Sequence, residues 1–421
     1  MNQLPRHNNQ KGYAWLLFFI WPFATAAAAL KNFRAPYAKN IIWAFTVFYG
    51  LTFYIGQGNE GADIVRYVEN FQLLHNQELT FSSAINYFLK SGEIDILRTL
   101  IAVLLSRITD AQPALTIVYG IIYGYFFSRN MWTILERLQG KLKWITLLLV
   151  ATLFLVNPIW NLNGFRMYTA AHIFIYGLFQ IYFNHKKSGI WFMIGSILVH
   201  FSFIFPVSIY VLYRLIGNKT TFFITFFIAS FFISEINIQP VNTFIDQYAP
   251  VRIQERTEGY RTLQQVEQFQ EQKTQSTKNW YAVWYGRGLK WAVCGFLVLI
   301  WYRGINPVKI DPAMYSLFNY ILLFYGFANI LANLPSGGRF IAVINIAAVG
   351  FLALYMQNIK IPSIIKTYSN LAVPALLLFV VVSVRTGFYS MSIHSVASNP
   401  FISMLFLDAN VSLNEVLKGI F

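Results

Sequence analysis

Long apolar runs separated by short polar linkers follow one another through almost the whole chain. Hydrophobic residues make up 56% of the 421 residues and charged residues only 12%, a balance that ordinary soluble domains do not have. The runs are continuous and do not alternate between polar and apolar residues, which excludes an outer-membrane barrel. The sequence therefore predicts an all-α polytopic integral membrane protein.

Ten of the runs approach the length of about 20 residues with which a helix crosses a bilayer. The predicted spans are 13–30, 41–56, 113–131, 144–160, 167–183, 221–236, 280–301, 313–332, 340–356 and 371–384. We expect the first to be an uncleaved helix and not a signal peptide, because further spans follow it. The stretch 190–213 is long for one crossing and short for two. Another, 94–108, carries Asp95, Arg98 and Arg107 and suits an interfacial or re-entrant helix better than a span. We therefore expect about 10–12 transmembrane helices in one transmembrane domain covering residues 1–421.

Basic residues gather in six linkers, which we predict to be cytoplasmic. They are Lys31, Arg34 and Lys39; Arg129, Arg137, Lys141 and Lys143; Lys186 and Lys187; Arg214 and Lys219; Arg303 and Lys309; and Lys360 and Lys366. All six lie on one side only if 94–108 does not cross and 190–213 crosses twice, with a break between His200 and Pro206. The external face then receives polar loops near 57–93 and 237–279. In 251–278 apolar residues recur near helical spacing, so we expect an amphipathic helix or a plain surface loop there.

Asp63, Arg66 and Tyr67 follow the second run at positions i, i+3 and i+4, which places them on one face of a helix. A carboxylate, a guanidinium and an aromatic ring in that arrangement are suited to holding a sugar. The alternative is a helix-start cap with a local ion pair. Glu93, before 94–108, is a second candidate carboxylate or a helix-dipole residue.

Arg166 stands in the polar break Pro158-Ile-Trp-Asn-Leu-Asn-Gly-Phe-Arg166, between two apolar runs. A permanently charged guanidinium at this place indicates an anionic or polar partner at the membrane surface, unless the side chain merely extends into the polar headgroup region. Arg339 follows a similar turn, and both turns contain glycine, so free backbone N–H groups can help to bind phosphate. His200 interrupts another apolar run and is either a proton carrier or a packing residue.

Several catalytic signatures are missing from the sequence. There is no glycine-rich Walker A loop, no His-Glu-x-x-His and no Gly-x-Ser-x-Gly. The single cysteine, Cys294, excludes an internal disulfide and a thiolate cluster. We expect no metal and no other cofactor, and no nucleic-acid motif accounts for the formal net charge of +15, which we interpret as a topology signal with some attraction to anionic lipid.

Four short motifs, taken in order, resemble the EpsG-type, Wzy-like polymerases of bacterial surface polysaccharides. They are Gly61-x-Asp63 with Tyr67 after the second run, Gly92-Glu93 before an apolar helix, Asn163 with Arg166 at the start of a span, and His200-x-Ser202 at the end of an apolar helix. Arg339 is a fifth, less secure match. The family usually carries an arginine just before the aspartate element, whereas Tyr54-Ile-Gly-Gln-Gly-Asn-Glu60 stands here. Either Arg66 takes over the role of that arginine, or the lipid-linked substrate is held differently.

The resemblance implies an enzyme that polymerises polyprenyl-diphosphate-linked oligosaccharide repeat units at the external face of the bacterial cytoplasmic membrane, giving capsule, exopolysaccharide or O-antigen. Donor and acceptor glycans and the bilayer would be its partners, with a flippase and a chain-length regulator beside it. The implied catalytic residues are Asp63 as base, Glu93 as reserve and His200 as relay. The implied binding residues are Arg66, Tyr67, Asn163, Arg166 and Arg339, with Arg252 and Arg256 in the loop 237–279 as further candidates. The alternatives are a transporter or flippase of lipid-linked oligosaccharide and a glycosyltransferase that uses polyprenyl-phosphate sugars.

Overall fold

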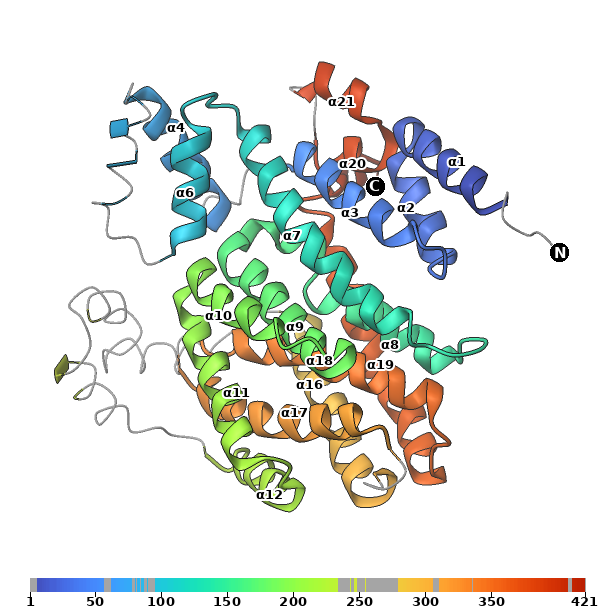
Figure 1. The fold of residues 1–421 in the computed structure, drawn as a ribbon. Helices are drawn as coiled ribbons and strands as arrows, with labels where there is room; N and C mark the ends of the chain where they lie inside the picture. Colours follow the sequence, from blue (N-terminus) through green and yellow to red (C-terminus); the bar gives the residue numbers. More distant parts are fainter. Residues whose placement is uncertain are drawn as a thin grey trace. The chain divides into compact units, whose positions relative to one another are not determined.

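The computed structural model describes residues 6–56, 62–77, 80, 82–83, 85–86, 89, 95–233, 243, 246–247, 254, 279–305, 310–334, 336–407 and 411–420. Their regular structure is helical apart from one isolated bridge between Ser392 and Ser412. The helices, labelled where room allows in Figure 1, are α1 (Arg6–Ile20), α2 (Pro22–Lys31), α3 (Ala38–Leu51), α4 (Asp63–Asn76), α6 (Ile96–Leu105), α7 (Gln112–Leu135), α8 (Trp144–Val156), η1 (Ile159–Gly164), α9 (Phe165–Asn184), α10 (Gly189–Val199), η2 (Phe201–Phe203), α11 (Ile204–Ile216), α12 (Thr220–Ala229), α16 (Trp280–Leu299), η3 (Ile300–Gly304), α17 (Pro312–Leu331), α18 (Arg339–Asn358), α19 (Ser363–Gly387), α20 (Ile393–Ala397), α21 (Pro400–Leu405) and α22 (Leu413–Ile420).

Among the described residues, five helical segments are long and apolar enough to cross a membrane. They are Trp144–Asn184, which joins α8, η1 and α9, and Trp280–Gly304, Pro312–Leu331, Arg339–Asn358 and Ser363–Gly387. The protein is therefore a polytopic membrane protein of the all-α class, as predicted. The chain forms two compact units: unit 1 comprises 1–138, 157–204 and 383–421, and unit 2 comprises 139–156 and 205–382. The prediction of one transmembrane domain stays a prediction.

In unit 1, α3 and α7 are antiparallel and closely packed, because glycine lets their backbones meet. A Cβ on Gly50 would overlap the carbonyl group of Thr116. The Gln112 Nε2 atom donates to the Phe53 carbonyl oxygen at 3.2 Å, so the chain leaves α3 and enters α7 at the same end of the pair. The segment between them, which contains α4 and α6, starts and finishes at that end. This agrees with the prediction that 94–108 does not cross.

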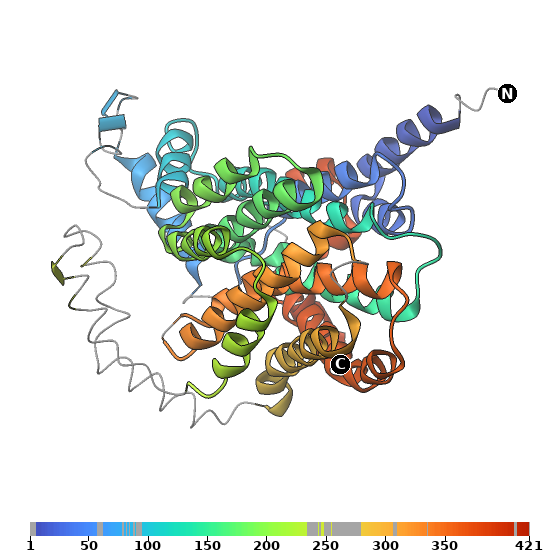
Figure 2. The same cartoon turned by 60° about the horizontal axis from the view of Figure 1, so that its bottom comes forward.

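The α9–α10 pair, green in Figure 2, is also antiparallel and meets at Gly177 and Gly189. α10 ends at Val199, His200 has an extended backbone (φ −150°, ψ 115°), and η2 and α11 follow. The predicted break in 190–213 is confirmed. It returns the chain to the level of Arg166 at the start of α9.

The basic linkers of unit 1 gather at one end. Lys39 forms an ion pair with Glu136 at 3.1 Å, and the Arg137 guanidinium donates to the Phe183 carbonyl at the end of α9, at 3.0 Å. The end of α9 with these basic linkers is opposite the end that carries Arg166.

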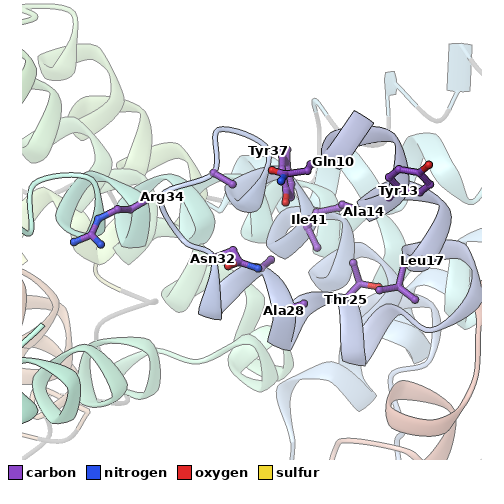
Figure 3. Close-up of a pocket in the computed structure, with 12 residues that line it drawn as sticks. Gln10, Tyr13, Ala14, Leu17, Thr25, Ala28, Asn32, Arg34, Tyr37 and Ile41 are labelled. Atoms are coloured by element: carbon purple, nitrogen blue, oxygen red, sulfur yellow. The ribbon is translucent and has the colours of Figure 1, made fainter. Parts of the chain in front are cut away.

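The first apolar run is a helical hairpin and not one span, so the predicted span 13–30 is wrong. α1 ends at Ile20, and α2 begins at Pro22 after an extended Trp21. Gln10 and Asn32 line the same pocket (Figure 3), although a straight helix would hold them about 33 Å apart. The apolar pattern did not show that the chain turns back at the Trp-Pro step. The hairpin brings the start of α1 to the basic end of unit 1.

The C-terminal helices lie at the other end of unit 1, beside α2 and α3 (Figure 1). The Ser392 hydroxyl donates to the Thr52 carbonyl oxygen at 2.9 Å, just after α3. The Trp21 indole at the tip of the hairpin donates to the Val396 carbonyl oxygen at 2.6 Å. The start of α1 therefore lies at the basic end of α3, and α20 lies at the opposite end of α3.

In unit 2, too, basic residues lie at one end of the helices. The Lys143 ammonium donates to the Met356 carbonyl oxygen at 2.6 Å, so the start of α8 lies at the end of α18. The Tyr213 hydroxyl donates to the Ser316 carbonyl oxygen at 3.1 Å, which brings the end of α11 to the start of α17. Because α17 and α18 are consecutive antiparallel helices, Lys143 and Tyr213 are at one end and Arg339 is at the other.

Thiol labelling tests this topology. Single cysteines at Ser336 and Gly419 should react with an impermeant thiol reagent in intact spheroplasts, whereas cysteines at Gly12 and Ser188 should react only after lysis. Native Cys294 is buried and should stay silent. Labelling of Gly12→Cys in intact spheroplasts would contradict the hairpin, and labelling of Ser188→Cys would reverse the orientation.

Candidate functional site

Four separate elements of unit 1 bring polar side chains together at the end opposite the basic linkers. They are Tyr67 in the first turns of α4, Asp95 before α6, Arg166 in the first turn of α9 and His200 in the break after α10. Helix ends place them there: each residue stands where an apolar run begins or is interrupted. Charged groups inside a membrane protein are costly unless they are paired, so their mutual contacts define the site.

Asp95 is the centre of this cluster, and its side chain is fully buried. Its Oδ2 atom lies 2.7 Å from Arg166 Nη1, and its Oδ1 atom lies 3.2 Å from His200 Nδ1. The backbone N–H of Phe201 donates to Oδ1 at 3.0 Å. Burial acts to raise the pKa of the Asp95 carboxyl, but these three donors outweigh it and lower the pKa to about 2. The carboxyl is therefore ionised at neutral pH and is a poor base.

Arg166 bridges Asp95 and Tyr67. Its Nε atom donates to the Tyr67 hydroxyl oxygen at 2.8 Å while Nη1 contacts the carboxylate. Nη2 has no acceptor among the described residues, and the side chain is 18% exposed. One arm of the fork thus remains for a ligand.

A second arginine, Arg98, lies against the same tyrosine. Its guanidinium carbon is 5.2 Å from the centre of the Tyr67 ring, and that of Arg166 is 5.4 Å away. Both are within the range of a cation–π interaction. The described residues therefore bring two guanidinium groups and one buried carboxylate to the same tyrosine ring and its surroundings.

His200 is oriented by Asp95. An ionised carboxylate only accepts hydrogen bonds, so Nδ1 must carry a hydrogen, and in the neutral imidazole Nε2 is then the nitrogen with the lone pair. Nε2 has no partner among the described residues, and the side chain is 14% exposed. A histidine whose Nδ1–H is held by a carboxylate and whose Nε2 is accessible can take a proton from a hydroxyl group.

The break that carries Arg166 rests on a buried polar network. The Tyr123 hydroxyl of α7 lies 2.9 Å from the Asn157 carbonyl oxygen and 2.7 Å from that of Pro158. His172 Nε2 lies 3.2 Å from the Asn157 carbonyl oxygen, and the Asn157 amide donates to the Tyr168 carbonyl at 3.1 Å. At membrane depth a helix break needs such partners, because no water satisfies its free backbone groups.

Removing the Tyr123 hydroxyl should therefore destabilise the protein. Tyr123→Phe leaves buried carbonyl oxygens without this donor and should cost about 1–3 kcal/mol, measured as thermal unfolding in a nonionic detergent. Tyr119, one turn earlier in α7, is a matched control because its buried hydroxyl has no hydrogen-bond partner among the described residues. Tyr119→Phe should be neutral or slightly stabilising, and equal losses for the two variants would contradict the role of Tyr123.

The structure places only some of the residues predicted from sequence in this cluster. Tyr67, Arg166 and His200 come together around Asp95. Asp63 and Arg66 form an ion pair with each other on the more exposed first turn of α4, at the edge of the cluster.

Asn163 holds α4 in place, since its Oδ1 atom accepts from the backbone N–H of Ile64 at 3.4 Å. Arg339 is exposed at the start of α18 in unit 2. Glu93, Arg252 and Arg256, and the helix predicted in 251–278, lie outside the described residues.

From the sequence, Asp95 and Arg98 indicated only that 94–108 does not cross the membrane, and neither was predicted as a site residue. Their signal was an acid and an arginine three residues apart at the start of an apolar helix, a place where each needs a partner. No group of three or more histidine, cysteine, aspartate or glutamate side chains that could hold a metal ion occurs in the described part of the chain.

The fold and this cluster define a polytopic helical membrane protein with a buried Arg-Asp-His site at one end. Comparison with protein families, with curated proteins and with solved structures finds no match for the chain.

Proposed function

We propose that the protein is a membrane glycosyltransferase that polymerises polyprenyl-diphosphate-linked oligosaccharide repeat units into a surface polysaccharide. The observation that carries the proposal is the cluster in which Asp95 holds both Arg166 and His200. It supplies a cationic arm and a base side by side, and the order of the motifs that resemble Wzy-like polymerases agrees with it. The site would face the exterior of the bacterial cytoplasmic membrane, because it lies at the end opposite the basic linkers.

The reaction needs two groups. A sugar hydroxyl of the acceptor attacks the anomeric carbon of the donor glycan, the bond from that carbon to the lipid diphosphate breaks, and the diphosphate leaves with the bonding electrons. His200 Nε2 would take the hydroxyl proton as the new glycosidic bond forms. Arg166, with Arg98 behind it, would stabilise the charge on the leaving diphosphate.

Asp95 is a positioning residue in this scheme, and its low pKa keeps it ionised while it orients Arg166 and His200. The geometry favours His200 over Asp63 as the base, because Asp63 pairs with Arg66 at the edge of the cluster. Tyr67 would support Arg166. Glu93 stays the candidate reserve base, Arg339 stays a candidate for stabilising the leaving diphosphate, and Arg252 and Arg256 stay candidates for binding substrate. A flippase and a chain-length regulator stay proposed partners.

Buried charge argues for an enzyme over a transporter. A carrier needs charged or polar groups along its whole pathway and on both faces. In unit 1 the buried carboxylate and its arginine lie at one end, and the uncharged polar groups deeper in the helices, such as Asn130 and His172, are hydrogen-bonded to one another and to Tyr123.

Defined donor lipids test the proposal. Purified protein in vesicles should convert a diphosphate-linked oligosaccharide into a ladder of products without ATP or a nucleotide sugar, resolved by gel electrophoresis. Addition of single sugars from a polyprenyl-monophosphate donor would instead favour a glycosyltransferase that uses polyprenyl-phosphate sugars. Movement of labelled lipid-linked glycan across the vesicle membrane without any ladder would favour a flippase.

A further inference from the structure

A pocket of about 620 Å³ lies between α1 and α2 toward the basic end of unit 1 (Figure 3). Its walls are small or apolar side chains, among them Ala14, Ala28, Ala29 and Ile41. Alanine at the facing positions of two helices leaves space that larger side chains would fill. Protein interiors are otherwise packed to a density that leaves few voids of this size.

The outer side of the hairpin is apolar and exposed. Leu16 is 61% exposed, Ile20 59% and Phe19 49%. In a membrane protein such a surface faces lipid, so hydrocarbon chains lie directly beside the pocket. An acyl chain can enter it and restore the contacts that an empty space would lose.

Three uncharged polar side chains line the pocket near the start of α1 and the end of α2. They are Gln10 in α1, Asn32 just after α2, and Tyr37 just before α3 (Figure 3). None of the three side chains makes a hydrogen bond with another described residue. Two amide groups and one phenol offer several donors, which suit the oxygens of a phosphodiester.

Lysine residues adjoin two of the polar lining residues in the sequence: Lys11 follows Gln10, and Lys31 precedes Asn32. Both lysines are exposed on their helices. Arg34 is at the pocket margin with its guanidinium directed away from the cavity in Figure 3, 3.5 Å from the Leu138 carbonyl oxygen. The excess of cations attracts an anionic headgroup.

We propose that this pocket binds a phospholipid with an anionic headgroup from the leaflet at the basic end of the protein. One acyl chain lies between the alanines of α1 and α2. The phosphate accepts hydrogen bonds from Gln10, Asn32 and Tyr37, and Lys11 and Lys31 select the anionic headgroup. This site is separate from the Arg166 cluster and does not depend on the polymerase proposal.

Lipid retention tests the inference with two neighbouring substitutions. Ala28 lines the pocket, whereas Ala27, the next residue, does not, and both are exposed. Purified protein would be equilibrated with micelles that contain phosphatidylglycerol or phosphatidylcholine, and bound lipid measured by native mass spectrometry. Wild type and Ala27→Phe should retain phosphatidylglycerol with at least about a tenfold preference, and Ala28→Phe should lose it, because its ring fills the chain site.

A charge variant keeps the test decisive if Ala28→Phe does not fold. Lys11→Gln with Lys31→Gln leaves the cavity open and should remove the preference for phosphatidylglycerol, whereas Lys186→Gln with Lys187→Gln, at the same end of unit 1, should keep it. Equal retention of the two lipids by wild type would overturn the proposal, as would undiminished retention by both the Ala28→Phe and the Lys11→Gln, Lys31→Gln proteins. Displacement of the lipid by inorganic phosphate alone would also overturn it, since the acyl chain would then contribute nothing.

Discussion

Asp95→Asn should abolish polymer formation and should destabilise the protein by about 3–5 kcal/mol, because it leaves the Arg166 charge buried without its carboxylate. Asp95 accepts hydrogen bonds from Arg166, His200 and the backbone N–H of Phe201. In the variant, the amide NH₂ group of asparagine would face one of these donors, and no hydrogen bond can form between two donors. Activity is measured with the diphosphate-linked donor and stability by unfolding in a nonionic detergent.

Asp63→Asn is the comparison that separates the two carboxylates. Asp63 pairs with Arg66, whose side chain is 67% exposed, so its loss should cost less than about 1 kcal/mol of stability. If Asp63→Asn abolished activity while Asp95→Asn remained active, the base would be Asp63, as the sequence predicted, and the role of the buried cluster would be refuted.

The pH dependence of stability gives Asp95 a signature of its own. Its folded-state pKa of about 2 lies below the ordinary aspartate value near 4, so the ionised carboxyl stabilises the fold at any pH above about 5. That contribution is lost as the pH falls from about 4 to 2. The stability difference between wild type and Asp95→Asn should therefore shrink as the pH falls below about 4. A difference that stayed the same from pH 5 down to pH 2 would assign the effect to another group.

Arg166→Lys should lower the polymerisation rate roughly a hundredfold, equivalent to about 3 kcal/mol of transition-state stabilisation. Lysine keeps the positive charge beside Asp95. It cannot also reach the Tyr67 hydroxyl and present a further N–H arm to the leaving diphosphate, because it has no planar fork. The protein should remain folded, since the carboxylate retains a cation.

The control for this variant is Arg214→Lys at the basic end of unit 2, which should change the rate less than twofold. Initial rates with the diphosphate-linked donor, normalised to folded protein, compare the two. A normal rate for well-folded Arg166→Lys protein would remove Arg166 from the reaction, and the leaving-group site would have to be sought at Arg339, Arg252 or Arg256.

Local sequence signals predicted the helix breaks at which part of this cluster lies. The polar break before Arg166 and the interruption at His200 are visible in the chain because asparagine, glycine and histidine end apolar runs. Arg166 attracted attention because a guanidinium is costly at that depth. These inferences needed no knowledge of neighbouring helices, and the structure confirms the helix breaks at both places.

The carboxylate was missed because its partners are distant in sequence. Asp95 meets Arg166 across 71 positions and His200 across 105. Charge spacing within one helix favoured Asp63 instead, and the structure gives that residue the local ion pair with Arg66 that was the alternative reading.

Hydrophobic runs determined the class of protein, because about 20 apolar residues in succession are stable as a helix in a bilayer. Basic linkers predicted which helix ends lie together, and in each unit they do lie together. Only the tertiary structure decided that the first run folds back at Trp21 and that Asp95 is the residue that holds Arg166 and His200. Both outcomes depend on packing between segments that are distant in sequence. A helical hairpin and a single straight helix of the same composition expose equally apolar surfaces to lipid, so composition does not distinguish them. A carboxylate can be buried only where the fold brings hydrogen-bond donors to it.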